Sequence, residues 1–255
     1  MPIKLIPPIT NNNAYTKNVF SNQIREMFNS IAPRYDLLNC LLSLGMDRYW
    51  RKAAVDGLRP LAGERILDLA TGTGDMALEI ASRFPPGKIL VCGADFSRNM
   101  LFRGAEKISQ AGQNHSLHLF SANAETLPFA NNSFQGATIA FGIRNFDNAE
   151  RGLEEVFRTL APRSRLLILE FSLPSHPLLR GVYLFYFRQI LPWVGCRVSG
   201  NSEAYKYLPE SVSAFPEKKT FIKTLEKKGF MNITIKSLTG GIVTLYSAYK
   251  NENSK

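Results

Sequence analysis

The stretch Arg65–Asp75, RILDLATGTGD, begins as a short apolar run and ends in a Gly-x-Gly turn. A run of this length predicts a buried strand, and the residues that follow, 76–81 (MALEIA), have helical spacing. Gly72 and Gly74 permit a tight turn whose bare backbone a ligand can approach. The turn also directs the free N–H groups of the helix toward that ligand. The sequence therefore predicts a strand, a ligand-binding turn and a helix.

Two classes of ligand use a turn of this kind. Together with Ala77, the glycines fit the dinucleotide fingerprint Gly-x-Gly-x-x-Gly/Ala. Asp68 argues against a dinucleotide, because its carboxylate would repel a nearby pyrophosphate. S-adenosylmethionine carries an ammonium group, which Asp68 and Asp75 would tolerate. Thr71 adds a hydroxyl for the carboxylate or the ribose of that cofactor.

A second acidic residue supports a ligand that contains a ribose. Residues 88–94 (KILVCGA) predict the next strand, and Asp95 follows directly. An acid about 20 residues beyond the glycines commonly accepts hydrogen bonds from ribose hydroxyls. Nicotinamide cofactors and S-adenosylmethionine both contain a ribose, so Asp95 does not choose between them. Asp is also a favoured N-cap residue, and the two roles are compatible.

Strands and helices alternate along the middle of the chain. The predicted strands are 66–69, 89–94, 117–122, 136–141 and 165–171, and the predicted helices are 75–83, 98–112 and 149–160. This alternation predicts an α/β fold with a doubly wound, mostly parallel sheet. Ligands bind such sheets outside the carboxyl ends of the strands. Residues at the ends of predicted strands should therefore meet there: Asp68, Asp95, Asn123, Arg144 and Glu170.

The chain of 255 residues fits one large domain. Residues 1–18 predict a mobile arm, and residues 19–250 a single domain. Helical spacing over about 19–60 predicts a helical cap at the carboxyl edge of the sheet, and an aromatic-rich stretch over about 174–214 predicts a helical insert. Arg180 and Arg188 interrupt the insert, so it does not predict a membrane span. Strands 233–237 and 242–249 follow.

Composition narrows the function classes. The net charge of +10 fits nucleic acid, an anionic membrane surface or simple solubility. No recognition-helix motif or zinc-finger spacing supports nucleic acid. The three cysteines lie far apart and the three histidines lack ligand spacing, which predicts a reducing compartment and no metal. No signal peptide is recognisable, so a cytoplasmic location is expected.

A set of motifs resembles the ubiquinone/menaquinone biosynthesis C-methyltransferases. The motifs are residues 35–39 (YDLLN), 67–75 (LDLATGTGD), 123–125 (NAE), 141–145 (FGIRN), 169–171 (LEF) and 207–211 (YLPES). The resemblance implies a Rossmann-like, class I S-adenosylmethionine-dependent methyltransferase fold. Two departures are Ala140, where the family often has Ser, and residues 161–165 (APRSR), where it usually has a Lys-Pro-Gly-Gly turn.

The resemblance implies transfer of a methyl group to a ring carbon of a prenylated hydroquinone, with S-adenosylhomocysteine as the second product. The favoured reaction converts demethylmenaquinol to menaquinol, and the alternative substrate is a benzoquinol of the ubiquinone pathway. Two residues, Tyr35 and Tyr205, are assigned to the substrate. Tyr35 fits core packing equally well. The residues assigned to the cofactor are Asp68, Thr71, Gly72, Gly74, Asp95, Asn123 and Ala124.

Arg144 and Asn145 are the candidate catalytic residues. A quinol carbon becomes nucleophilic when a hydroxyl, with a phenol-like pKa of about 10, loses its proton. Arg144 stays protonated, so it would stabilise the phenolate and orient a water, and Asn145 would hold the same water or the ring oxygen. The alternative is a structural ion pair between Arg144 and Asp147 or Glu170.

Three rival functions remain to be compared with this hypothesis. They are a nicotinamide-dependent oxidoreductase, a nucleic-acid methyltransferase and a binding protein without activity. The chain lacks the Asn/Asp-Pro-Pro-aromatic and Pro-Cys motifs that nucleic-acid methyltransferases use. The expected partners are therefore the prenylated quinol and the inner face of a membrane, through peripheral contact, without nucleic acid. A homodimer is compatible with the sequence.

Overall fold

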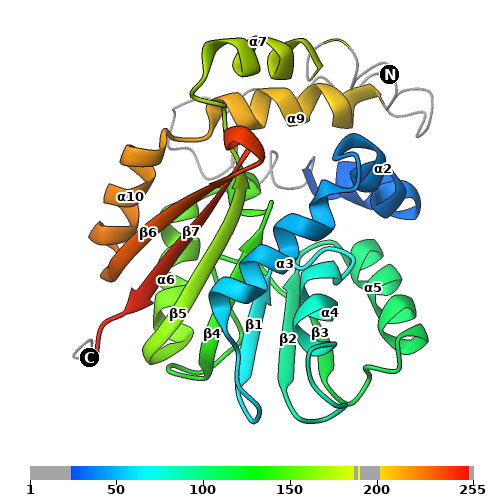
Figure 1. Ribbon diagram of the computed structural model, residues 1–255. Coiled ribbons are helices and arrows are strands. Elements are labelled where there is room, and N and C mark those ends of the chain that lie inside the picture. The colour runs from blue at the N-terminus through cyan, green and yellow to red at the C-terminus, as the bar shows by residue number, and fades with distance from the viewer. Residues whose placement is uncertain (1–23, 187–188, 190–201, 253–255) are drawn as a thin grey trace.

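The computed structural model describes residues 24–186, 189 and 202–252 (Figure 1). The predicted mobile arm, residues 1–18, lies outside this part of the chain. The described residues form a sheet of seven strands in the order β3-β2-β1-β4-β5-β7-β6. The strands are β1 (Arg65–Leu69), β2 (Leu90–Asp95), β3 (Leu117–Ser121), β4 (Phe134–Ala140), β5 (Leu160–Phe171), β6 (Phe230–Leu238) and β7 (Val243–Lys250).

The predicted doubly wound, mostly parallel sheet is confirmed. Strands β1 to β5 pair in parallel, and β7 is inserted antiparallel between β5 and β6. The chain winds outward from β1 through β2 to β3 and then returns to the other side of β1 with β4. The order reverses between β1 and β4, and ligands bind open α/β sheets at such a point.

Helices cover both faces of this sheet (Figure 1). On one face, α3 (Met46–Leu58), α4 (Asp75–Ala81) and α5 (Arg98–Gln110) share a core with Ile66 and Val91. On the other face, α6 (Ala149–Thr159) and α10 (Lys218–Lys227) share a core with Leu67 and Ala137. Ile66 and Leu67 belong to different cores because neighbouring side chains of a strand point to opposite faces.

A third apolar core joins two segments that lie far apart in the sequence. The cap consists of helical residues 24–31, η1 (Ala32–Arg34) and α2 (Tyr35–Leu42). The insert contributes α7 (Pro177–Phe185) and α9 (Ser202–Ala214), which lie above one end of the sheet in Figure 1. Ile24 and Ile31 of the cap share this core with Tyr183 of α7 and Tyr207 of α9. The cap and the insert therefore cover the carboxyl edge together.

Two local features add detail to the sequence expectations. Helix α9 lies within the predicted helical insert and continues through Pro209. Its buried residues Tyr207 and Val212 pack into the third core, and this tertiary packing outweighs the unfavourable proline. Strand β5 begins at Leu160 rather than at residue 165, and its pairing with β4 shifts register at this end.

Candidate functional site

The ends of β1 and β4 hold an unusual backbone conformation. Ala70 follows β1 with φ of 57° and Phe141 follows β4 with φ of 56°, although neither residue is glycine. A Cβ atom on Gly142 would overlap the Cβ of Ala70, so the two chain segments touch at this point. Strained backbone of this kind is concentrated at ligand-binding and catalytic sites. It occurs here at the point where the strand order reverses.

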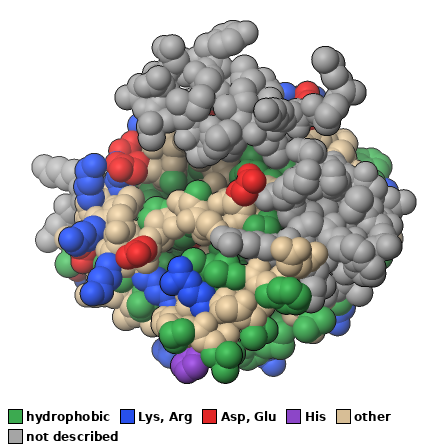
Figure 2. Space-filling model, turned by 90° about the horizontal axis from the view of Figure 1, so that it is seen from above, with side chains coloured by type: hydrophobic (Ala, Val, Ile, Leu, Met, Phe, Trp, Pro, Cys, Tyr) green, Lys and Arg blue, Asp and Glu red, His purple; other side chains and the backbone are tan. Residues whose placement is uncertain are grey.

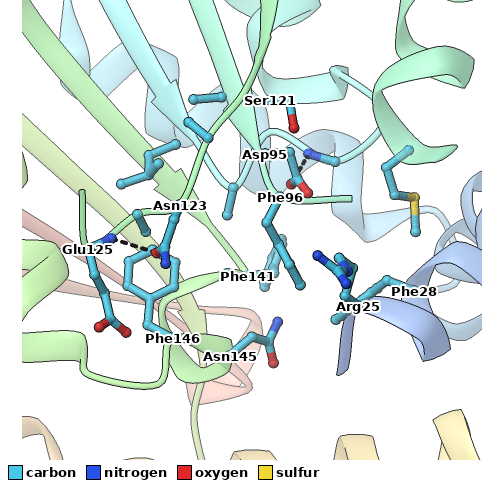
Figure 3. Close-up of a pocket in the computed structure, with 18 of the residues that line it drawn as sticks. Arg25, Phe28, Asp95, Phe96, Ser121, Asn123, Glu125, Phe141, Asn145 and Phe146 are labelled. Atoms are coloured by element: carbon cyan, nitrogen blue, oxygen red, sulfur yellow. Dashed lines mark hydrogen bonds between the residues drawn. The ribbon is translucent and has the colours of Figure 1, made fainter. Parts of the chain in front are cut away.

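A cavity of about 500 Å³ opens beside these strand ends, a volume suited to a small-molecule ligand (Figure 3). Every strand from β1 to β4 contributes to its wall, and the cap covers one side. The wall comprises Arg25, Phe28 and Tyr35 of the cap; Leu69, Ala70 and Gly72; Ala94, Asp95, Phe96 and Met100; Ser121, Ala122, Asn123, Ala124 and Glu125; and Ala140, Phe141, Gly142, Asn145, Phe146 and Asp147.

Asp95 is buried at the end of β2 and lines this cavity. Its Oδ2 accepts from the backbone N–H of Gly72 at 2.8 Å, and its Oδ1 accepts from the N–H of Ser97 at 2.8 Å. Burial raises the pKa of Asp95 to about 6, although these backbone hydrogen bonds oppose the rise. Helix α5 is capped by Ser97, whose side chain accepts from Met100 N, so the N-cap role considered for Asp95 belongs to Ser97.

Asp68 and Thr71 lie beneath the turn rather than in the cavity wall. Thr71 Oγ1 donates to Asp68 Oδ2 at 2.6 Å, and Thr138 Oγ1 donates to Asp68 Oδ1 at 2.7 Å. Burial raises the pKa of Asp68 to about 6. The assignment of these two side chains to the cofactor stays a prediction. Their hydrogen bonds fix the glycine turn to the neighbouring strand β4.

The glycine turn is also tied to the cap by charged side chains. Asp36 of α2 accepts from Thr73 Oγ1 at 2.5 Å and from Lys107 Nζ at 2.8 Å. Lys107 also pairs with Asp75, and Arg51 lies 3.5 Å from the same carboxylate. The carboxylate of Asp75 thus has protein cations as partners. The network holds α2 against the turn.

The two glycines of the turn and the neighbouring Tyr35 have different positions. Gly72 lines the cavity, whereas Gly74 is the N-cap of α4 with φ of 80° and does not line it. Gly74 therefore serves the conformation of the turn, which corrects its assignment as a contact. Tyr35 lies over Gly72 and lines the cavity. The side chain of Tyr205 lies outside the described part of the structure, although its backbone belongs to α9.

Asn123 and Ala124 follow β3 and line the cavity, and in Figure 3 Asn123 lies on the opposite side from Arg25 and Phe28. Asn123 Oδ1 accepts from the backbone N–H of Glu125 at 2.9 Å. Since this bond uses the carbonyl oxygen of the amide, the donor nitrogen of Asn123 remains for a ligand. This side of the cavity thus offers an amide donor and polar backbone.

Arg144 is buried and does not line the cavity. It donates from Nη1 to Glu170 Oε1 at 2.5 Å and to the carbonyl oxygen of Phe141 at 2.6 Å. The exposed fractions of the Arg144 and Glu170 side chains are 7% and 0%. Burial is the largest effect and by itself would lower the pKa of Arg144. The charge of Glu170 and its hydrogen bond, together with Tyr207 and Tyr35, outweigh burial, so the pKa is raised. The ion pair with Glu170 that was considered as the alternative is therefore present, and direct contact of Arg144 with a ring oxygen stays a prediction.

Asn145, the next residue, does line the cavity. It ends η2 (Ile143–Asn145), a short helix whose Asn145 N–H donates to the carbonyl oxygen of Gly142 at 2.9 Å. Its side-chain Oδ1 accepts from the hydroxyl of Tyr207 at 2.9 Å. The two candidate catalytic residues therefore have different surroundings, and of the two only Asn145 lines the cavity.

Several residues of the cavity wall were not among the predicted site residues. Arg25 and Phe28 extend into the cavity from the cap (Figure 3). Phe28 packs edge-on against Tyr35 and Phe96, with ring centroids 6.2 and 6.4 Å away. Residues 25 and 28 lie three positions apart, so helical spacing could have predicted that they share one face of a helix. The spacing could not have predicted that this face is directed toward the cavity.

The sequence profile of the ubiE/COQ5 methyltransferase family matches residues 16–250 of this chain. A relative from Syntrophotalea carbinolica, named ubiquinone/menaquinone biosynthesis C-methyltransferase UbiE, is 48% identical over 227 residues, covering 89% of this chain and 94% of the relative. A relative from Bacteroides fragilis, named demethylmenaquinone methyltransferase, is 37% identical over 230 residues, covering 90% of this chain and 93% of the relative.

Solved structures share the fold at low sequence identity. The [4+2]-cyclase SpnF superposes with a TM-score of 0.68 and 15% identity, covering 91% of this chain and 96% of its own. A SAM-dependent methyltransferase from Thermotoga maritima superposes with a TM-score of 0.62 and 18% identity, covering 89% of this chain and 99% of its own. At these identities the likeness concerns the arrangement of strands and helices.

Proposed function

Because the chain belongs to the ubiE/COQ5 methyltransferase family, we propose that it transfers a methyl group from S-adenosylmethionine to a ring carbon of a prenylated hydroquinone. The favoured substrate is demethylmenaquinol, which becomes menaquinol, and a benzoquinol is the second candidate because the relatives' names include ubiquinone biosynthesis. The observation that carries the proposal is the cavity at the sheet's reversal point, with Asp95 in its wall and Tyr35 and Asn145 near the cap.

The residues of the cavity fit this cofactor. Asp95 would accept from the ribose hydroxyls, since each of its oxygens accepts one backbone N–H and has a further lone pair. Asn123 and the backbone of Ala124 would face the adenine, and Gly72 would let the methionine part approach the turn. The charged residues of the wall are Arg25, Asp95, Glu125 and Asp147, an acidic balance suited to a ligand with net positive charge. When bound, the cofactor supplies a methyl group attached to a sulfonium.

The chain's own residues would activate the quinol. Asn145 would donate a hydrogen bond to the ring oxygen as the hydroxyl loses its proton, and the charge of Arg144 behind it would favour the phenolate. The adjacent ring carbon would form the new carbon–carbon bond as the bond between the methyl group and the sulfonium breaks, with S-adenosylhomocysteine as the leaving group. The proton on that carbon would then pass to water, which restores the aromatic ring. Tyr35 and Phe28 would form the apolar wall beside the ring.

The direct test is methyl transfer by the purified protein. Labelled S-adenosylmethionine would be incubated with reduced demethylnaphthoquinols and with reduced benzoquinols of matched tail length, under anaerobic conditions. We expect label in the ring of the naphthoquinol, and the rate with the benzoquinol measures the second candidate. Tight binding of the cofactor without label in any quinol would contradict the proposed function.

Lowering the pH through about 6 is expected to weaken the binding of S-adenosylmethionine. The pKa of Asp95 is raised to about 6, and protonation removes the charge that accepts from the ribose. At neutral pH, Asp95→Asn should weaken binding by about 1.5–3 kcal/mol, the range for hydrogen bonds to a charged group. The affinity of this variant should also depend less on pH. Calorimetry at about pH 7.5 and about pH 5 measures both effects, with the exposed Asp56→Asn as the control.

Unfolding at the lower pH is not expected to cause this loss. The folded-state pKa of Asp95 and Asp68, about 6, exceeds the ordinary value of 3.8. The folded chain therefore binds more protons than the unfolded chain between about pH 6 and about pH 4, so these groups favour folding as the pH falls through that window. Unchanged affinity in Asp95→Asn would remove Asp95 from the binding site.

We propose further that α7 attaches the protein to the surface of a membrane. Leu178, Val182 and Phe185 lie on one face of this helix and are 71%, 61% and 62% exposed. Figure 2 shows hydrophobic side chains alongside groups of Lys and Arg side chains on the side seen from above. Within the described residues, every helix is too short or too polar to cross a bilayer. Attachment at the surface would give access to a substrate whose prenyl tail is dissolved in lipid.

Substituting Leu178, Val182 and Phe185 together with Glu should weaken binding to anionic vesicles by tenfold or more. Each apolar side chain contributes about 1.5–3 kcal/mol when fully buried, so partial insertion of all three exceeds the roughly 1.4 kcal/mol for a factor of ten. Flotation at low and high salt measures the effect, and Leu61→Glu, at a 65% exposed residue, is the control. Equal flotation of wild type and variant would exclude α7 as the attachment site.

A further inference from the structure

Tyr207 reaches from α9 to the short helix η2 and fixes one side chain of the cavity wall. Its hydroxyl donates to Asn145 Oδ1 at 2.9 Å. Tyr207 is only 8% exposed and does not line the cavity, whereas Asn145 does. With the oxygen held by Tyr207, the amide nitrogen of Asn145 lies on the cavity side (Figure 3). The amide therefore presents a donor to a bound molecule.

The hydrogen bond between Tyr207 and Asn145 has one direction. An amide oxygen only accepts, so the Tyr207 hydroxyl is the donor to Asn145 Oδ1. The charge of Arg144 lowers the pKa of Tyr207, and the charges of Glu170 and Asp147 raise it. Burial outweighs the effect of Arg144 and raises the pKa of Tyr207 to about 12, so the hydroxyl keeps its proton at neutral pH.

The backbone on both sides of Asn145 is fixed as well. Its own N–H donates to the carbonyl oxygen of Gly142 at 2.9 Å, and the N–H of Phe146 donates to the carbonyl oxygen of Ile143 at 3.2 Å. The remaining freedom of Asn145 is rotation of its side chain, including exchange of the amide oxygen and nitrogen. A side chain rotated in this way would present an acceptor to a developing phenolate, and the two negative dipoles would repel. The contact with Tyr207 opposes that rotation.

We propose that Tyr207 is a positioning residue that holds Asn145 Oδ1 so that Nδ2 donates to the ring oxygen of the quinol. This inference rests on the proposed function, since the ring oxygen belongs to the proposed substrate. Asn145 lines the cavity and Tyr207 does not, so Tyr207 would act on the ring oxygen only through Asn145.

A double-mutant cycle tests whether Tyr207 acts through Asn145. Loss of one donor to an oxyanion lowers turnover by about 10²–10³, and loss of its positioning should give a smaller effect. We expect Tyr207→Phe to lower kcat by about 10- to 100-fold with the wild-type Asn145 present. In the Asn145→Ala background, the same substitution should change kcat by less than about twofold, because the group that Tyr207 positions is gone.

Two further readouts separate positioning from a loss of structure. Calorimetry should give the same dissociation constant for S-adenosylmethionine in wild type and Tyr207→Phe, and the KM for the quinol should change less than kcat. The matched control is Tyr246→Phe on β7, a buried tyrosine that does not line the cavity, for which kcat should be unchanged. Equal fold-losses from Tyr207→Phe in both Asn145 backgrounds would overturn the inference, because Tyr207 would then act independently of Asn145.

An NMR measurement tests the hydrogen bond between Tyr207 and Asn145 independently of activity. In protein labelled with isotope-enriched asparagine, the side-chain amide resonances of Asn145 are identified by their absence in Asn145→Ala. These resonances should shift in Tyr207→Phe and stay in place in Tyr246→Phe. Unshifted resonances in Tyr207→Phe would exclude the hydrogen bond. If the wild type transferred no methyl group to any quinol, the proposed function would fail, while this spectrum would still report whether Tyr207 holds Asn145.

Discussion

Arg144→Ala is expected to lower the free energy of unfolding by about 3–5 kcal/mol, because it leaves the carboxylate of Glu170 buried without its cation. The variant should also lose turnover by about 10²–10³, the scale for a lost oxyanion donor, since the charge of Arg144 would favour the phenolate. Affinity for S-adenosylmethionine should change little in molecules that remain folded, because Arg144 does not line the cavity. Urea unfolding, calorimetry and single-turnover kinetics measure the three quantities.

The double variant Arg144→Met/Glu170→Gln separates stability from chemistry. It removes both charges of the buried pair and retains an oxygen on residue 170 for the N–H of Phe171. Neutral replacement of a buried ion pair is often tolerated, so most of the lost stability should return. Turnover should stay low. Arg151→Ala, at an exposed pair with Glu154, is the control and should cost at most about 1 kcal/mol. Wild-type turnover in the double variant would show that Arg144 serves stability alone.

Methyl transfer is expected to stop when the quinol substrate is replaced by its oxidised quinone. The reduced ring can form a phenolate, which makes the adjacent carbon nucleophilic. The oxidised ring has no hydroxyl proton to lose, and its ring carbons are electrophilic, so neither Asn145 nor the charge of Arg144 can activate it. The requirement follows from the direction of electron flow, because the ring must donate an electron pair to the methyl carbon.

The experiment uses one batch of quinone divided into reduced and oxidised portions. Labelled methyl incorporation should be measurable with the reduced portion and undetectable with the oxidised portion in the absence of reductant. Adding a reductant to the oxidised portion should restore the reaction, which controls for damage to the substrate or enzyme. Equal rates in both portions would contradict the phenolate mechanism while leaving the methyltransferase assignment in place.

The elements of the fold could be predicted because their signals are local. Apolar runs of strand length, glycine turns and helical spacing each occupy a short window, and the carboxyl edge follows from parallel pairing. Asp95 was placed correctly at the end of β2 for the same reason. The sequence does not show locally which strands become neighbours. Asp68 is opposite Thr138 only because β1 pairs with β4, so the hydrogen bond that occupies its carboxylate was not predicted.

The arrangement around Arg144 shows the same limit at the level of side chains. Because Arg144 follows β4, its position in the sequence correctly predicted that it lies at the carboxyl edge of the sheet. The sequence did not predict whether its side chain lies in the cavity wall or in the protein interior. Its direction is set by Glu170 on the neighbouring strand β5. The contact between Tyr207 and Asn145 joins residues separated by 62 positions, and it depends on how α9 packs against the cap. No local pattern encodes such a contact.

The position of β7 has a consequence for how the chain folds during its synthesis. Strand β5 pairs with β4 along one edge and with β7 along the other. The segments that form α7, α9, α10 and β6 are synthesised between β5 and β7. Until β7 arrives, the apolar β5 has an open edge that another unfolded chain could pair with. Closing the sheet is thus a late, non-local step, and such steps are slow. The yield of folded protein in cells should therefore fall as the time that newly made chains spend with β5 unpaired on this edge increases. Chaperones that shield strand edges should raise that yield.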